Sequence, residues 1–191
     1  GVGPLANSLR QLDTAQRVPL VRALLARGAD PNGRITTSTV ASSNCTLKDG
    51  ARNAMGRGIG NLKGATPLWV AAWTLQHQKS VHRASVRGSG SADVMRALLA
   101  AGGDVHLTTA DKTTPLMVAA GLGRRKGAGG FFEAPRGPET PLAEAGVKLL
   151  LAAGADVNAA TRETASTALM WALSEPHPAV ARALLDAGAD P

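Results

Sequence analysis

Apolar residues recur along this chain in short runs that share one ending. In the run before Gly154, Val147, Leu150 and Leu151 fall on one stripe of a helix. A glycine follows each run and can take the left-handed conformation that ends a helix. The pattern therefore predicts helices near residues 18–27, 93–101, 144–153 and 178–187. The four endings are Gly28-Ala29-Asp30, Gly102-Gly103-Asp104, Gly154-Ala155-Asp156 and Gly188-Ala189-Asp190.

A second phrase recurs between these runs and predicts a partner helix for three of them. A threonine at its start can cap the first helical turn. Proline suits the position after the threonine, because the first helical N–H has no partner inside the helix. Small alanines follow, which allows two helices to pack closely. The phrases are Thr66-Pro67-Leu68-Trp69, Thr114-Pro115-Leu116-Met117 and Thr167-Ala168-Leu169-Met170.

The order of these phrases resembles the ankyrin repeat. Thr167 precedes Gly188 by 21 residues, which is the offset of that family. The corresponding offset is 36 residues from Thr66 to Gly102 and 40 residues from Thr114 to Gly154. The two helices of those repeats are therefore separated by insertions. A third insertion of about 26 residues lies between Asn32 and Gly64. The resemblance covers roughly two thirds of the chain and does not extend to the insertions.

The resemblance implies an all-α fold, an ankyrin-repeat solenoid of helix-turn-helix units with hairpin fingers and long loop insertions. We expect the chain to be a segment of a longer array, because solenoids need polar capping repeats and neither end supplies one. The expected divisions are a degenerate first repeat at 1–32, an insertion at 33–63, repeats with inter-helix insertions at 64–106 and 107–158, and a regular, truncated repeat at 159–191.

The net charge of +7 is concentrated in the insertions. Residues 33–63 carry five basic side chains and one acidic, residues 76–91 carry three basic and none acidic, and residues 121–144 carry four basic and three acidic. Such segments are either solvated loops or an anion-binding surface, and a steep salt dependence of binding would favour the second.

Catalytic and metal chemistry have no support in the motifs. His77 and His82 lie five residues apart without further ligands, and Cys45 is the single cysteine. The glycine-rich run that ends at Gly64 lacks the spacing and the flanking elements of a phosphate loop. The chain has no apolar run long enough to span a membrane. We therefore expect no enzymatic activity, no metal and no cofactor.

Candidate partner-binding residues follow from aligning each Thr-Pro-Leu phrase with the family. In ankyrin repeats, the finger residues just before the threonine and the end of the first helix contact partners. Trp73 is a plausible aromatic anchor at such a position. The predicted residues are Lys63, Ala65, Trp73, Thr74, Asp111, Lys112, Thr113, Leu122, Thr164, Ser166, Ser174 and Glu175.

Three further expectations rest on departures from the family pattern. Lys112 stands where fingers usually have glycine, so it must adopt a left-handed conformation if the usual turn is kept. Trp69 replaces a histidine that normally bonds the adjacent finger, and we expect it to pack instead. His106 occupies the asparagine position of an Asp-Val-Asn phrase, where its ring can still bond neighbouring backbone.

The function implied by the resemblance is a non-enzymatic, monomeric scaffold that binds a protein or peptide on its concave face. No specific nucleic acid is expected as a partner. One alternative is an accessory repeat region of an exported bacterial enzyme or c-type cytochrome encoded elsewhere in the chain. A second is the anion-binding surface of the basic insertions. The resemblance favours an exported or periplasmic location in a bacterium over a cytoplasmic one.

Overall fold

The computed structural model describes residues 14–36, 63–76, 92–121, 141–162, 164–174 and 177–191. These residues form seven helices and no strand. The four helices predicted from the apolar runs are confirmed to within a few residues, as α2, α5, α7 and α9. The helices are α2 (Thr14–Ala26), α4 (Pro67–Gln76), α5 (Ala92–Ala100), α6 (Pro115–Ala120), α7 (Pro141–Ala152), α8 (Ala168–Ser174) and α9 (Pro178–Asp186).

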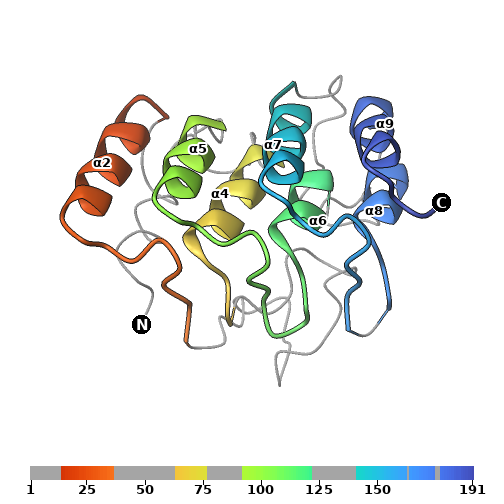
Figure 1. The fold of residues 1–191 in the computed structure, drawn as a ribbon, viewed down its shortest axis with the longest axis horizontal. Coiled ribbons are helices and arrows are strands. Elements are labelled where there is room, and N and C mark those ends of the chain that lie inside the picture. The colour runs from red at the N-terminus through yellow and green to blue at the C-terminus, as the bar shows by residue number, and fades with distance from the viewer. Residues whose placement is uncertain (1–13, 37–62, 77–91, 122–140, 163, 175–176) are drawn as a thin grey trace, which may run out of the picture.

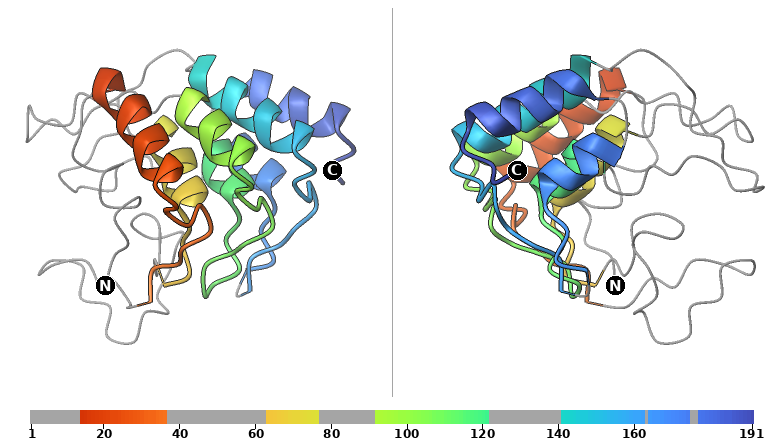
Figure 2. Two further views of the ribbon diagram at one scale, coloured as in Figure 1. Left: turned by 60° about the vertical axis from the view of Figure 1, so that its left-hand side comes forward. Right: turned by 90° about the vertical axis from the view of Figure 1, so that its right-hand side faces the viewer.

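The helices form two layers. The outer helices α2, α5, α7 and α9 stand side by side in chain order, and the inner helices α4, α6 and α8 lie behind them (Figure 1). The segments that join each outer helix to the next inner helix extend away from both layers as fingers (Figure 2). This is the architecture of an all-α ankyrin solenoid, as the sequence predicts.

Each inner helix begins with the threonine predicted to cap it. The Thr66 Oγ1 accepts a hydrogen bond from the Trp69 amide at 3.2 Å, and the Thr114 Oγ1 accepts one from the Met117 amide at 3.2 Å. The Thr167 Oγ1 likewise accepts a hydrogen bond from the Met170 amide, three residues later, at 3.4 Å. These bonds satisfy amide groups that have no partner inside the helix.

Each outer helix ends at the predicted glycine. These glycines have φ between 83° and 89°, in the left-handed region. The residue after each glycine donates its amide to a carbonyl five residues earlier, which closes the last turn. The helix ends are therefore set by bonds within one short stretch of chain. The glycines are Gly28, Gly102, Gly154 and Gly188.

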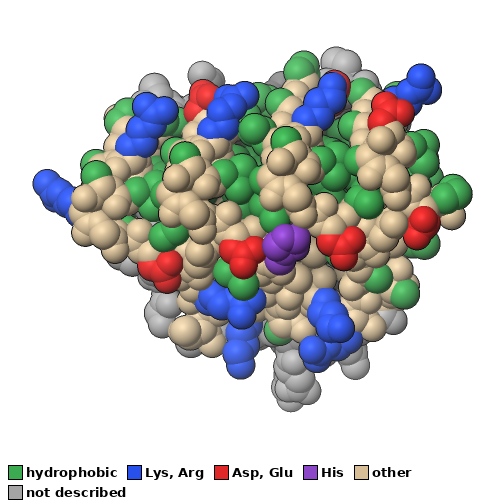
Figure 3. Space-filling model, viewed as in Figure 1, with side chains coloured by type: hydrophobic (Ala, Val, Ile, Leu, Met, Phe, Trp, Pro, Cys, Tyr) green, Lys and Arg blue, Asp and Glu red, His purple; other side chains and the backbone are tan. Residues whose placement is uncertain are grey.

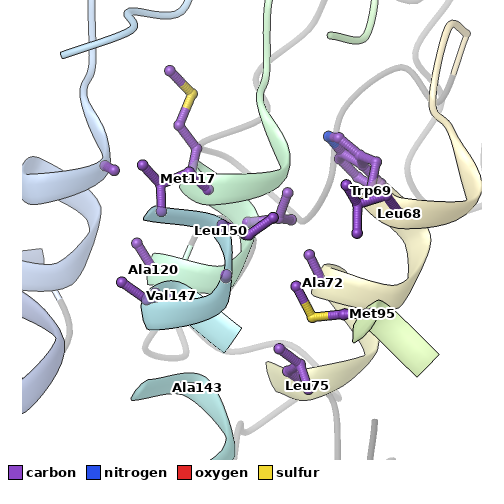
Figure 4. Packing of buried hydrophobic residues seen from close by; sticks show 14 of the residues in the cluster. Leu68, Trp69, Ala72, Leu75, Met95, Met117, Ala120, Ala143, Val147 and Leu150 are labelled. Carbon is purple, nitrogen blue, oxygen red and sulfur yellow. The ribbon is translucent and has the colours of Figure 1, made fainter. Parts of the chain in front are cut away.

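The core lies between the inner and outer layers. Leu68 and Leu75 of α4, Met95 of α5 and Leu150 of α7 are fully buried there (Figure 4). Gly146 lets α7 approach closely, because a Cβ at this position would collide with the Leu75 side chain. The core is thus continuous from one repeat to the next, as expected for repeats that bury their faces only against neighbours.

The three predicted insertions fall mainly on residues 37–62, 77–91 and 122–140, outside the described residues. The expected divisions at 1–32, 33–63, 64–106, 107–158 and 159–191 stay a prediction.

Candidate partner-binding surface

Three fingers project from the helices. The first comprises residues 30–36 and 63–66, the second residues 104–114, and the third residues 156–162 and 164–167. Each finger is closed by a backbone bond between its two arms. The amide of Ile35 donates to Ala65 O at 3.0 Å, that of Thr109 to Thr113 O at 3.1 Å, and that of Thr161 to Ser166 O at 3.1 Å.

Neighbouring fingers are joined into a ladder by backbone bonds. The Ala110 amide donates to Lys63 O at 2.8 Å, and the Arg162 amide donates to Asp111 O at 3.0 Å. The Arg34 guanidinium adds a side-chain link between the first two fingers. Its Nε donates to Gly64 O at 3.2 Å and its Nη2 to Thr108 O at 2.7 Å. The three fingers therefore act as one braced surface.

Trp69 contributes a further link that corrects the expectation from its sequence. Its side chain is fully buried in the core, as expected. Its indole Nε1 also donates to Thr113 O in the adjacent finger at 3.2 Å. Trp69 therefore both packs and bonds the next finger. The expectation that packing would replace the bond was wrong, because the indole ring has a donor of its own.

The left-handed conformation expected of Lys112 is confirmed. Its φ is 59°, and Ala165 has φ 50° at the same position of the third finger. Gly64 holds this position in the first finger with φ 88°. The finger turn is thus kept in all three repeats, although only one of them has the residue that adopts it without steric cost.

Asparagine side chains connect the turns of successive repeats. Asn32 donates from Nδ2 to Gly102 O at 2.9 Å and accepts from the Asp104 amide at 2.8 Å. Asn158 connects its own turn to the last turn in the same way. Its Nδ2 donates to Gly188 O at 3.2 Å, and its Oδ1 accepts from the Asp190 amide at 2.9 Å. Each pair of bonds spans neighbouring repeats.

His106 stands at the corresponding position of the middle turn. Its backbone amide donates to Asp104 Oδ1 at 2.7 Å. Its exposed ring makes no hydrogen bond to the described residues, so the expected bond from the ring to backbone is absent. The imidazole is a different shape from an amide and cannot present a donor and an acceptor side by side. The middle turn therefore lacks the connection that the other two have.

The predicted finger residues divide into exposed and buried sets. Lys63, Lys112 and Thr164 are exposed, and Asp111 is half-buried. The side chains of Ala65, Thr113 and Ser166 are buried, so these three predicted residues are not exposed on the fingers. These three residues supply the carbonyls that close the fingers. The Ser166 hydroxyl is also bonded to that of Thr164 at 2.8 Å.

On the inner helices the predicted residues are less completely described. Trp73 is half-buried and packs against the core. Ser174 is exposed, and its hydroxyl donates to Trp171 O at 2.9 Å. Leu122 and Glu175 lie outside the described residues, as does the side chain of Thr74.

Basic side chains gather in two places (Figure 3). Those at the fingers are exposed, and we call Arg34, Lys63, Lys112 and Arg162 the finger ridge. Those on the outer helices occupy one position of the repeat, six residues before each terminal glycine. We call Arg22, Arg96, Lys148 and Arg182 the convex row. The last three of this row pair with acids on the same helix, namely Asp93, Glu144 and Asp186.

Arg34 and Arg162 were not among the predicted partner-binding residues. They entered the sequence argument only through charge counts, because the family alignment looks at the residues before each threonine. The signal that could have found them is the position of each relative to the preceding Gly-Ala-Asp phrase, which places both in the first arm of a finger.

An exposed apolar surface lies at α8. Met170 is 56% exposed and Leu173 is 67% exposed. The equivalent positions on α4 are Trp69 and Ala72, both fully buried. In the internal repeats this surface is covered by the next repeat, so the exposure at α8 continues the stacking interface of the solenoid.

Within the described residues, no group of three or more histidine, cysteine or acidic side chains is arranged to hold a metal ion. No helix among them is long and apolar enough to cross a membrane.

A family model described as ankyrin repeats (3 copies) matches residues 81–191, which is more than half of the chain. The chain belongs to the ankyrin-repeat family. Ankyrin repeats are generally protein–protein interaction modules, and the family is typically non-enzymatic. A search of curated protein sequences finds no significant match. In this ankyrin-repeat chain, the exposed finger residues are accordingly the first place to look for a partner site.

Proposed function

We propose that the protein binds a protein or peptide partner through its finger tips and the adjoining inner face. The observation that carries this proposal is the braced ladder of fingers. Lys63, Lys112 and Thr164 are exposed on it, while backbone bonds at 2.8 Å and 3.0 Å hold neighbouring fingers in register. A surface that is already ordered loses little conformational entropy when a partner binds.

The inner face supplies a second part of the proposed site. Trp73 is half-buried on α4, so part of its ring is accessible while the rest is anchored in the core. Aromatic side chains held in this way are enriched among the residues that dominate binding energies. Ser174 on α8 offers an exposed hydroxyl at the position equivalent to Trp73, two inner helices further along the array.

The proposal can be tested with peptides selected from a random display library on the immobilised protein. The affinity of each selected peptide is then measured for Lys112→Ala and Trp73→Phe. Arg22→Ala serves as the matched control, because it removes an exposed cation from the convex row. We expect the first two variants to weaken binding on the order of tenfold and the control to leave it unchanged.

Two results would contradict the proposal. One is a set of peptides whose binding depends on Arg22 but not on Lys112 or Trp73, which would place the site on the convex side. The other is failure to select any peptide that binds the folded protein. Circular dichroism and melting of each variant confirm that the comparison is made between folded proteins.

A further inference from the structure

We infer that the finger ridge recognises an extended acidic segment of a partner protein, with carboxylates spaced along it. This inference rests on the proposed function and adds the chemistry of the partner. The four basic side chains come from three consecutive fingers and are all exposed. All four lie on fingers whose backbones are bonded to a neighbouring finger.

The acidic side chains at the base of the fingers are held in the turns beside the outer helices. Asp30, Asp104 and Asp156 each accept the amide of the residue two positions later, at 2.8 Å, 2.7 Å and 3.0 Å. Their carboxylates are therefore engaged in the turns next to the outer helices. Asp111 is the acidic residue at a described finger tip, and it is half-buried. The exposed charge of the described tips is thus predominantly positive.

The ridge is also held in a fixed shape. Arg34 is braced by carbonyls of two fingers, so its guanidinium cannot move away from them without losing both bonds. Lys112 is kept at φ 59°, an unfavourable conformation for a residue with a Cβ, where the first finger has glycine.

The spacing of the fingers suits an extended chain. Neighbouring packed helices lie about 8–10 Å apart, so successive fingers repeat at about that distance. An extended peptide advances about 3.3 Å per residue. An acidic residue at every third position would therefore meet a cation on each successive finger. Charge complementarity of this kind fixes register and steers association.

A nucleic acid suits the ridge less well. Asp111 lies within it, because its own carbonyl accepts the Arg162 amide and the preceding residue, Ala110, donates its amide to Lys63 O, and it would face a continuous row of phosphates. The described finger residues include no Phe, Tyr or Trp on which bases could stack. A peptide can leave a gap in its charges opposite Asp111, whereas a phosphate backbone cannot.

The test uses a fluorescent peptide of roughly twelve residues with Glu at every third position and small polar residues between. A matched peptide has Gln in place of each Glu. Binding is followed by anisotropy with the full chain at about 0.05 M and about 0.3 M salt, a range over which screening of exposed charges strengthens. The ridge variant is Lys63→Glu with Lys112→Glu. The matched control is Arg22→Glu with Lys148→Glu, which changes the net charge equally on the convex row.

We expect the Gln peptide to bind on the order of tenfold more weakly than the Glu peptide, and the ridge variant to lose at least as much affinity for the Glu peptide. The control variant should stay within about twofold, because long-range effects of net charge are screened. Equal losses in the ridge and control variants would overturn the inference, since binding would then follow net charge alone.

Two further outcomes separate this inference from the proposed function. In the first, a single-stranded oligonucleotide of similar length binds more tightly than the Glu peptide, and the ridge variant loses this binding. That result would overturn the choice of a protein segment as the partner. Display-selected peptides that depend on Trp73 or Lys112 but show no preference for Glu over Gln would overturn only the acidic chemistry. Absence of any peptide binding at the fingers or inner face would overturn both.

Discussion

His106→Asn should stabilise the solenoid at its middle turn. Asn32 and Asn158 each span two repeats with one donated and one accepted hydrogen bond. The groups that an asparagine at position 106 would reach are Gly154 O and the Asp156 amide. Neither has a hydrogen-bond partner among the described residues. The substitution therefore supplies two bonds that the chain's own pattern already makes at both other turns.

The expected gain can be worked from these bonds. An intramolecular hydrogen bond contributes about 0.5–1.5 kcal/mol net. The equivalent bonds at Asn32 and Asn158 are exposed, so water competes with them and each should contribute an amount near the lower end of that range. Two of them should therefore raise the free energy of unfolding by about 1 kcal/mol. For a chain of this size, such a gain corresponds to an increase in Tm of about 2–4 °C.

Urea denaturation followed by tryptophan fluorescence is a suitable assay. Trp69 and Trp73 lie on α4, before the middle turn, and Trp171 lies on α8, after it. The midpoint should increase while the slope of the free energy against urea stays constant. Asn158→Ala and Asn32→Ala are matched controls that should lower the midpoint by a similar amount. If both alanine variants lose stability and His106→Asn gains none, the middle turn has a different geometry and the reasoning fails. If neither alanine variant changes stability, the connecting bonds contribute nothing.

Three other substitutions test the fingers by the same denaturation assay. Lys112→Gly should raise the free energy of unfolding by up to about 1 kcal/mol through relief of the left-handed strain, less the entropy that glycine adds to the unfolded chain; a destabilised variant would refute the strain argument. Gly64→Ala should cost at least about 1–2 kcal/mol, because its Cβ would lie 3.0 Å from Thr108 O at φ 88°; an unchanged midpoint would mean that the fingers can separate freely. Trp69→Phe should cost about 1–3 kcal/mol through the lost bond to Thr113 O and the smaller ring; a loss below about 0.5 kcal/mol would show that the indole bond contributes little.

Features that depend on neighbours in the chain could be predicted from the sequence. The threonine caps bond an amide three residues later, and the terminal glycines close a turn within six residues. Their geometry is therefore settled by short stretches such as Thr66–Trp69. The left-handed Lys112 could also be predicted, because the finger turn is a local conformation that the repeat template places at a known offset.

Features that join distant residues were decided only by the tertiary structure. Asn32 reaches a turn 70 residues away, Arg34 a carbonyl 74 residues away and Trp69 one 44 residues away. Burial of Thr113 likewise depends on the neighbouring finger and on the indole that bonds its carbonyl. The sequence by itself determined where each outer helix ends and where each inner helix begins, because the bonds that set these points are local. It could not determine which polar finger residues would be buried and which would form the finger ridge. That depends on how successive repeats stack and on which side chains meet between neighbouring fingers.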